Sequence, residues 1–182
     1  MSQLQSPTPG FLFAAVLFRK DLHQVSDLIA IWEKKWGAGL PFFHSYCPMK
    51  RYYAKEMGPE SDLDRFFILT PILVKRESLV SAKHWSQALE KKYEQNNARQ
   101  VNWDVGILTL ENLQLATGKN FTHRVYLGEG IFSDLTLIYQ KGDFNALDWS
   151  YPDYSHPEIK HFFCWAREIL HLKLKEIPPG RK

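Results

Sequence analysis

Residues 11–18, FLFAAVLF, are apolar at every position. A strand with one exposed face alternates apolar and polar side chains, whereas a strand buried on both faces is apolar throughout. The run is also only about half as long as a membrane-spanning helix requires. We therefore predict that residues 11–18 form a buried central strand of a sheet.

Helical and extended patterns alternate after this strand. Beyond Asp21, which can cap a helix, apolar residues recur at helical spacing as far as the glycines at 37–39. We predict extended segments over 41–58 with a break at Pro48, a strand at 65–75, a helix from Ser78 to about Gln95 and a strand at 100–110. A short helical or turn segment at 111–120, a hairpin at 121–139 and a loop from 141 onward should follow. The C-terminal helix is predicted to begin at Ser155, with Glu158 completing a capping box.

This order of elements predicts an α+β fold. The first six elements follow the split pattern of a ferredoxin-like βαββαβ core, which a C-terminal β-hairpin and helix would extend. We expect residues 1–10 to form a loose tail, residues 11–176 a single domain, and residues 177–182 a second tail. The length of 182 residues and the 45% hydrophobic fraction suit one domain with a sizeable core.

Composition narrows the class of protein. The net charge of +3 is mild, and no strand carries the basic-aromatic pattern of an RNA-binding sheet, so we do not expect nucleic acid as a partner. Two cysteines without close spacing predict neither a disulfide scaffold nor a zinc site. The N-terminus has no signal-peptide pattern. We therefore expect a cytoplasmic protein that does not bind membranes.

Residues 116–130, ATGKNFTHRVYLGEG, form the densest group of functional side chains. The GK pair suggests a phosphate-binding P-loop, but Leu113 replaces the required first glycine and Asn120 replaces the required serine or threonine. His156, His161 and His171 lack the i, i+4 spacing of metal ligands on a helix. We therefore predict neither a P-loop nor a metal site, and the sequence designates no cofactor.

The predicted hairpin allows a test of register. A three-residue loop at 128–130 would place Arg124 opposite Asp134 and His123 opposite Leu135. Side chains alternate between the faces of a strand, so Arg124 would lie on a polar face and His123 on an apolar one. A two-residue loop would shift the register and separate Arg124 from Asp134. Arg124 is thus either one half of a structural ion pair or a binding residue, and His123 either a core residue or a catalytic one.

Several separated blocks resemble one family. YYAKEMG (52–58), the segment from Arg99 to Tyr139, and WSYPDY (149–154) occur in the same order as in the bacterial family known as domain of unknown function 4416. The resemblance extends from about residue 11 to 172, with Val105 standing where relatives often have proline. It implies no particular activity.

Two hypotheses of function follow. In the first, the protein binds or acts on an anionic small molecule that carries a phosphate or resembles a nucleotide. The candidate catalytic residues are Glu56, Asp104 and His123, and the candidate binding residues are Lys119, Asn120, Arg124, Tyr52, Tyr53, Asp153 and Tyr154, with Trp103 as a further ring that could stack on a base. If this is right, Lys119, His123, Arg124, Glu56 and Asp104 should line one concave pocket.

In the second hypothesis, the protein is a non-catalytic interaction or regulatory domain. The same polar residues would then fix turns and cross-strand pairs. The abundant aromatic residues would serve a partner surface or a homo-oligomer.

Overall fold

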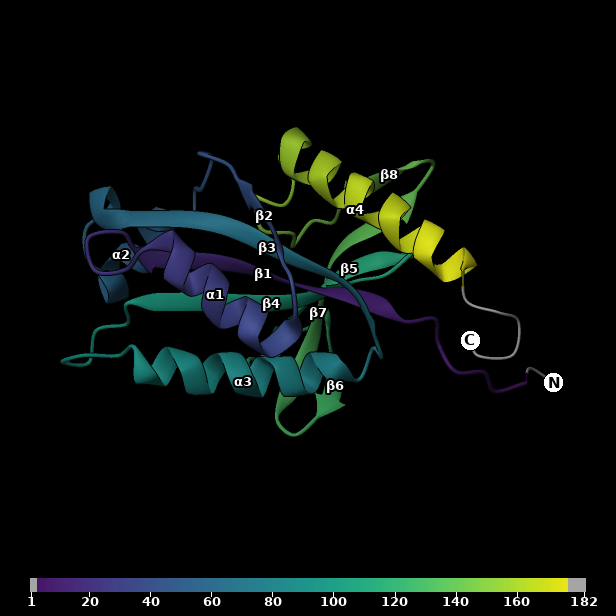
Figure 1. The fold of residues 1–182 in the computed structure, drawn as a ribbon, viewed down its shortest axis with the longest axis horizontal. Helices are drawn as coiled ribbons and strands as arrows, with labels where there is room; N and C mark the ends of the chain where they lie inside the picture. The colour runs from purple at the N-terminus through teal and green to yellow at the C-terminus, as the bar shows by residue number, and fades with distance from the viewer. Residues whose placement is uncertain (1–2, 177–182) are drawn as a thin grey trace.

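The computed structural model describes residues 3–176, so the predicted tail at 177–182 and the first two residues of the predicted N-terminal tail lie outside the described part. The described chain forms an eight-stranded antiparallel sheet and four α-helices (Figure 1). The strands are β1 (Gly10–Arg19), β2 (Leu40–Phe43), β3 (Leu63–Val74), β4 (Val101–Leu108), β5 (Asn112–Thr117), β6 (Arg124–Gly128), β7 (Ile131–Gln140) and β8 (Asp143–Ala146). The helices are α1 (Val25–Trp36), α2 (Lys50–Met57), α3 (Ser78–Lys92) and α4 (Pro157–Lys175), with a short 3-10 turn at Glu60–Asp62.

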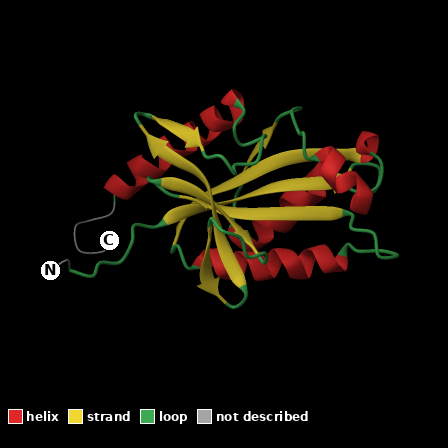
Figure 2. Cartoon of the chain, turned by 180° about the vertical axis from the view of Figure 1, so that it is seen from behind, coloured by secondary structure: helices red, strands yellow, loops and turns green. Residues whose placement is uncertain are grey.

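The prediction of a buried central strand at 11–18 is confirmed. β1 lies between β3 and β4 and pairs antiparallel with both. Every residue from Phe11 to Phe18 is buried. Figure 2 shows the long strands side by side, with helices on either side of them. The run contains no polar side chain because helices cover both faces of this part of the sheet.

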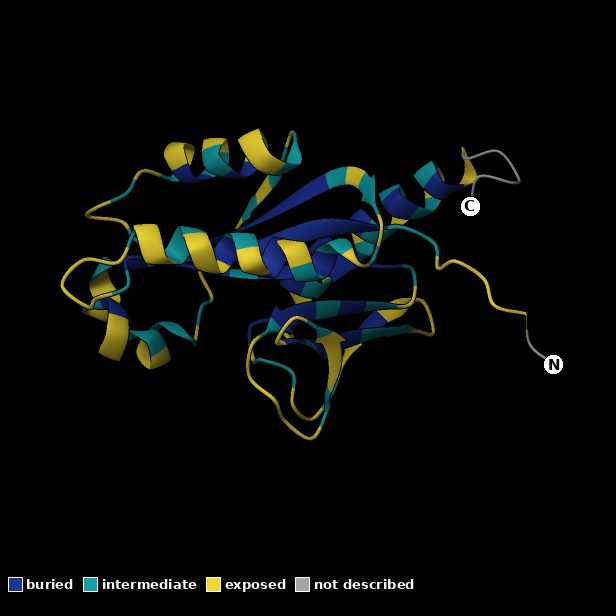
Figure 3. Ribbon diagram, turned by 90° about the horizontal axis from the view of Figure 1, so that it is seen from below, coloured by how far each residue is buried: buried dark blue, intermediate teal, exposed yellow. Residues whose placement is uncertain are grey.

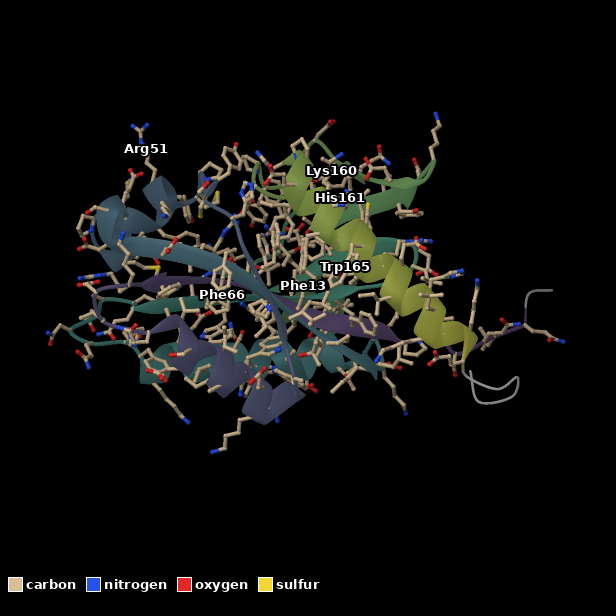
Figure 4. All side chains as sticks on the ribbon, turned by 45° about the horizontal axis from the view of Figure 1, so that its top comes forward. Phe13, Arg51, Phe66, Lys160, His161 and Trp165 are labelled. Atoms are coloured by element: carbon tan, nitrogen blue, oxygen red, sulfur yellow. The ribbon has the colours of Figure 1, made fainter. Side chains whose placement is uncertain are left out.

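The two faces of the sheet carry separate cores. On one face, Leu12, Ala14 and Val16 of β1 pack beneath α1 and α3. On the other face, Phe11 and Phe13 pack against α4. In Figure 3 the inward sides of α1 and α3 are buried and their outward sides exposed. In Figure 4, Phe13 and Phe66, which belong to opposite cores, both lie inside the molecule.

Tryptophan concentrates in the core under α1 and α3. The rings of Trp32 and Trp103 stack with centroids 6.1 Å apart, and Trp85 meets both rings edge to face. Such aromatic pairs contribute about 0.5–1.5 kcal/mol each beyond simple burial. This use in the core accounts for much of the high tryptophan content. It also excludes the predicted stacking of Trp103 on a ligand, because that side chain is fully buried.

The α+β class is confirmed, but the ferredoxin-like assignment is not. The strand order across the sheet is β2-β3-β1-β4-β5-β7-β6, with β8 paired to β7. β1 to β4 are therefore only part of a larger sheet, and α4 covers the face opposite α1 and α3. The prediction treated the C-terminal hairpin and helix as an extension. In the structure they continue the same sheet and close its second face.

Three segments differ from their predictions. Residues 50–57 form α2 rather than an extended segment, because Tyr53 and Met57 share one face of the helix and pack beside Leu17 and Leu63. Residues 112–117 form β5 rather than a helical or turn segment, since they pair with both β4 and β7. Residues 143–146, predicted as loop, form β8.

The C-terminal helix also begins later than predicted. α4 starts at Pro157 after His156, and no side chain caps it. The predicted capping box at Ser155 is therefore wrong. Proline suits the first turn because its missing N–H would have no partner inside the helix.

The predicted register of the hairpin is confirmed. Arg124 lies opposite Asp134. The turn itself differs, because Gly128 pairs with Ile131 and leaves only Glu129 and Gly130 as the loop, both with positive φ. An irregularity between Tyr126 and Gly128 supplies the extra residue that keeps the register unchanged.

Candidate functional site

The sheet opens along one side of β4. β4 pairs with β5 only over Gly106–Leu108, so its first five residues have β1 on one side and no strand on the other. At this open edge the Trp103 N–H donates to Glu90 Oε1 of α3 over 2.7 Å. A helix carboxylate thus satisfies a backbone donor that would otherwise bond to a neighbouring strand. The gap beside this edge is the entrance to a pocket.

The pocket has a volume of about 370 Å³. Its walls come from α2, α3, the open edge of β4, the end of β5 with the loop after it, and single residues of β7 and the segment before α4. Arg51, at the start of α2, projects away from the molecule (Figure 4). The lining side chains are mostly polar and include Tyr52, Tyr53, Glu56, Lys83, Gln87, Glu90, Arg99, Asn102, Asp104, Thr117, Lys119, Asp134 and Tyr151.

Half of the predicted site residues line this pocket. They are Tyr52, Tyr53, Glu56, Asp104 and Lys119. Of the five residues that were expected to share one pocket, three line it, namely Glu56, Asp104 and Lys119. His123 and Arg124 do not line it and instead contact Asp134, which does. Asn120 is exposed and lies outside the pocket. Segments distant in sequence therefore converge here.

Asp104 is the centre of a hydrogen-bond network. Its Oδ2 accepts from Asn102 Nδ2 at 2.8 Å and from the Tyr53 hydroxyl at 3.4 Å. Burial, followed by the negative charge of Asp104, raises the pKa of Tyr53 far above its ordinary value. Tyr53 therefore stays protonated and acts as a donor. Both bonds use Oδ2, which leaves Oδ1 of Asp104 able to accept from a ligand.

Four charged side chains of the pocket were not among the predicted site residues, namely Asp134, which pairs with Arg124, and Lys83, Glu90 and Arg99. Lys83 and Glu90 share a face of α3, and Arg99 precedes β4. Arg99 donates to Asn102 Oδ1 at 2.7 Å and lies 3.6 Å from Glu56 and 3.9 Å from Glu90. Burial raises the pKa of Glu90, although Lys83 opposes that shift.

The sequence did contain a signal for Lys83. It follows Leu79 by four positions and so lies on the inner side of α3, where apolar residues were expected. Lys83 is only 8% exposed. A lysine at a buried helical position is unusual unless it serves a partner or a site.

Arg124 holds the loop that carries Lys119, and both Arg124 and His123 contact Asp134. Arg124 Nε donates to Asp134 Oδ2 at 2.8 Å, and its Nη1 donates to the Lys119 carbonyl at 3.0 Å. His123 Nε2 lies 3.4 Å from the same carboxylate oxygen, and its ring stacks on Trp149. The prediction that His123 points to the opposite, apolar face is wrong, because β6 begins only at Arg124 and strand alternation does not apply before it.

Asp153 and Tyr154 line a second, smaller chamber of about 30 Å³. The carboxylate of Asp153 pairs with Arg65 Nη1, and both side chains are almost fully buried. Arg65 also donates to the Tyr46 carbonyl at 2.7 Å and lies over the ring of Phe67. Burial raises the pKa of Asp153, and Arg65 opposes that shift. Tyr154 is 2% exposed, so it cannot stack on a ligand in the main pocket as predicted.

Residues 3–176 contain no group of three or more His, Cys, Asp or Glu side chains arranged to hold a metal ion. Within the same range, no helix has the length and apolar character needed to cross a membrane.

The described residues thus define an α+β protein whose antiparallel sheet opens at β4 to a polar pocket. Residues 8–170 match the family described as "Domain of unknown function (DUF4416)". The chain therefore belongs to this family, as the sequence blocks at 52–58, 99–139 and 149–154 indicated. No curated protein and no solved structure matches the chain.

Proposed function

We propose that the protein binds a small molecule with a phosphate or another anionic group in the pocket beside β4. The observation that carries this proposal is the convergence of three cationic side chains, Lys83, Arg99 and Lys119, from three separate segments. Within the described range, the lysines that form ion pairs are Lys50 and Lys160. The ammonium groups of Lys83 and Lys119 therefore remain available to a ligand.

The carboxylates of the pocket balance much of this charge, but within residues 3–176 neither Lys83 nor Lys119 forms an ion pair with them. Asp134 forms an ion pair with Arg124, and Arg99 lies near the carboxylates of both Glu56 and Glu90. The network around Asp104 adds hydrogen-bonding capacity close to the cations. The ligand that fits best therefore joins an anionic group to a hydrogen-bonding body, as nucleotides and sugar phosphates do. Tyr52 is 55% exposed at this pocket, and its ring offers a stacking surface.

Among the three candidate catalytic residues, Asp104 is the one we assign as general base. Its Oδ1 is available, and it lines the pocket. Glu56 lies near Arg99, and His123 faces Asp134 rather than the pocket. A base must reach the proton that it removes, so Asp104 has the best position for that role.

The test measures the melting temperature with AMP, ribose 5-phosphate and inorganic phosphate. A ligand present at about 100 times its Kd stabilises the folded state by about 2.7 kcal/mol. For a chain of this size that equals a shift of about 5–10 °C. Lys83→Met and Lys119→Ala should each weaken binding by about tenfold or more, since each removes a charge-assisted hydrogen bond.

Lys34→Ala is the matched control, because Lys34 is exposed on α1 and does not line the pocket. This variant should bind as the unaltered protein does. Absence of any shift with all three compounds would refute the proposal. Equal shifts in the Lys83, Lys119 and Lys34 variants would refute the assigned site.

A second candidate function rests on the outer edge strand. β6 ends the sheet and exposes Val125 (66%) and Tyr126 (60%), with the 62% exposed Phe121 just before it. An edge strand with exposed apolar side chains is prone to pair with another strand. We propose a homo-oligomer formed through β6 as the alternative. Light scattering after size exclusion tests it, and Val125→Glu should yield monomers where the unaltered chain gives dimers.

A further inference from the structure

The second chamber lies directly beside the main pocket. Tyr53, Asp104, Leu115 and Tyr151 line both spaces. The second chamber measures about 30 Å³, which exceeds the roughly 10–15 Å³ that one water molecule requires. It can therefore hold one water-sized polar group. We call it the inner chamber.

Two buried polar atoms at this chamber have no partner. The Tyr154 hydroxyl and Arg65 Nε are inaccessible to solvent, and neither forms a hydrogen bond within the described part of the chain. Both residues line the inner chamber, and each is at least nine-tenths buried. Burying a polar atom without a partner costs about 1–3 kcal/mol, so a protein rarely keeps two such atoms at one place without a use.

The charges around the chamber determine which group fits. Arg65 is already neutralised by Asp153, and the carboxylate of Asp104 adds a further negative charge. A second anion would therefore be repelled. A carbonyl group could accept a hydrogen bond but could not donate one to Oδ1 of Asp104. A hydroxyl group can do both, because it carries one donor and two acceptor positions.

We infer that the inner chamber is a hydroxyl-binding subsite of the main pocket. The inference rests on the proposed function, in which Lys83, Arg99 and Lys119 hold the anionic group. The expected ligand is then a phosphorylated polyol or sugar, either free or as part of a nucleotide. One of its hydroxyl groups enters the inner chamber beside Tyr154. This hydroxyl takes the position that a water molecule can occupy in the absence of ligand, and it reproduces the water's hydrogen bonds.

The experiment compares two phosphates by isothermal titration calorimetry. Ribose 5-phosphate has the hydroxyls, and tetrahydrofurfuryl phosphate has the same ring and phosphate without them. The unaltered protein should bind ribose 5-phosphate at least about tenfold more tightly, because the analogue leaves buried polar groups unpaired. Tyr154→Phe should weaken binding of ribose 5-phosphate by about five- to tenfold and leave the affinity for the analogue unchanged.

Tyr154→Phe should also fold normally. The substitution keeps the ring in place and removes a hydroxyl that has no partner, so the melting temperature should stay the same or rise. Tyr93→Phe makes the same chemical change outside both chambers and serves as the control. Asp104→Asn is the second variant and should likewise reduce the preference for ribose 5-phosphate, since it removes the charged acceptor.

Each result decides a separate point. Equal binding of the two phosphates by the unaltered protein overturns the hydroxyl subsite and leaves the phosphate site standing. Failure of both to bind overturns the proposed function and the subsite together. If Tyr154→Phe weakens both compounds equally, Tyr154 acts only on the structure of the pocket, and the subsite is overturned. If that variant does not fold, an unchanged preference in Asp104→Asn overturns it.

Discussion

The buried ion pair between Arg65 and Asp153 gives the strongest prediction about stability. Both side chains are at most 6% exposed. Asp153→Asn keeps the size of the side chain and the oxygen that accepts from the Tyr154 N–H at 3.1 Å. It removes only the negative charge and leaves the Arg65 guanidinium buried without a counter-ion. Breaking a buried pair in this way costs about 3–5 kcal/mol.

That cost predicts a fall in melting temperature of about 6–20 °C, since 1 kcal/mol shifts a chain of this size by about 2–4 °C. Urea unfolding followed by tryptophan fluorescence measures the same loss as a lower midpoint. The double variant Arg65→Met/Asp153→Leu replaces the pair by apolar side chains and should recover most of the stability. The reasoning would be refuted if Asp153→Asn lowered the melting temperature by less than about 2 °C. It would also be refuted if the double variant were no more stable than the single one.

Three further predictions concern other buried groups. Burial raises the pKa of Glu90, so the folded state binds more protons than the unfolded chain and the free energy of unfolding falls as pH rises from about 4. Glu90→Gln should make this fall smaller in urea titrations between pH 4 and 7. The same pH dependence in the variant and in the unaltered protein would contradict this prediction. Arg124→Ala leaves Asp134, which is 3% exposed, without its closest cation. It should lower the free energy of unfolding in urea by about 1–3 kcal/mol. A decrease of less than about 0.5 kcal/mol would exclude a structural role for the ion pair. Gly106→Ala would place a Cβ 2.3 Å from the ring of Phe13 and 2.5 Å from the backbone oxygen of Gln114, so it should lower the free energy of unfolding by about 1–3 kcal/mol. An unchanged melting temperature would contradict this close packing.

Local patterns predicted the fold where several short-range signals agreed. The apolar run at 11–18 indicated burial on both faces, and the structure encloses β1 between two strands and two layers of helices. The pairing of Arg124 with Asp134 was also predicted, although the assumed three-residue loop is absent and the irregularity between Tyr126 and Gly128 restores the register. These features depend on residues close in sequence, for which the spacing of side chains is fixed by backbone geometry.

Predictions failed where distant contacts outweighed local preference. ENLQLAT, at 111–117, has residues that favour helices, yet pairing with β4 and β7 makes it a strand. RYYAKEM, at 51–57, has tyrosines that favour strands, yet the burial of Met57 beside Leu17 favours a helix. His123 lies just before β6, so alternation assigned it to the wrong face.

The sequence by itself determined the α+β class, the family, the central strand and five of the residues that line the pocket. It determined them because motif residues such as Glu56, Asp104 and Lys119 differ in type from the core residues around them. Only the tertiary structure decided that these residues meet Lys83 and Arg99 in one pocket. That meeting depends on β4 separating from β5 after three residue pairs and on α3 lining the gap. Such a separation is set by contacts between elements far apart in the chain, which no local pattern of residues records.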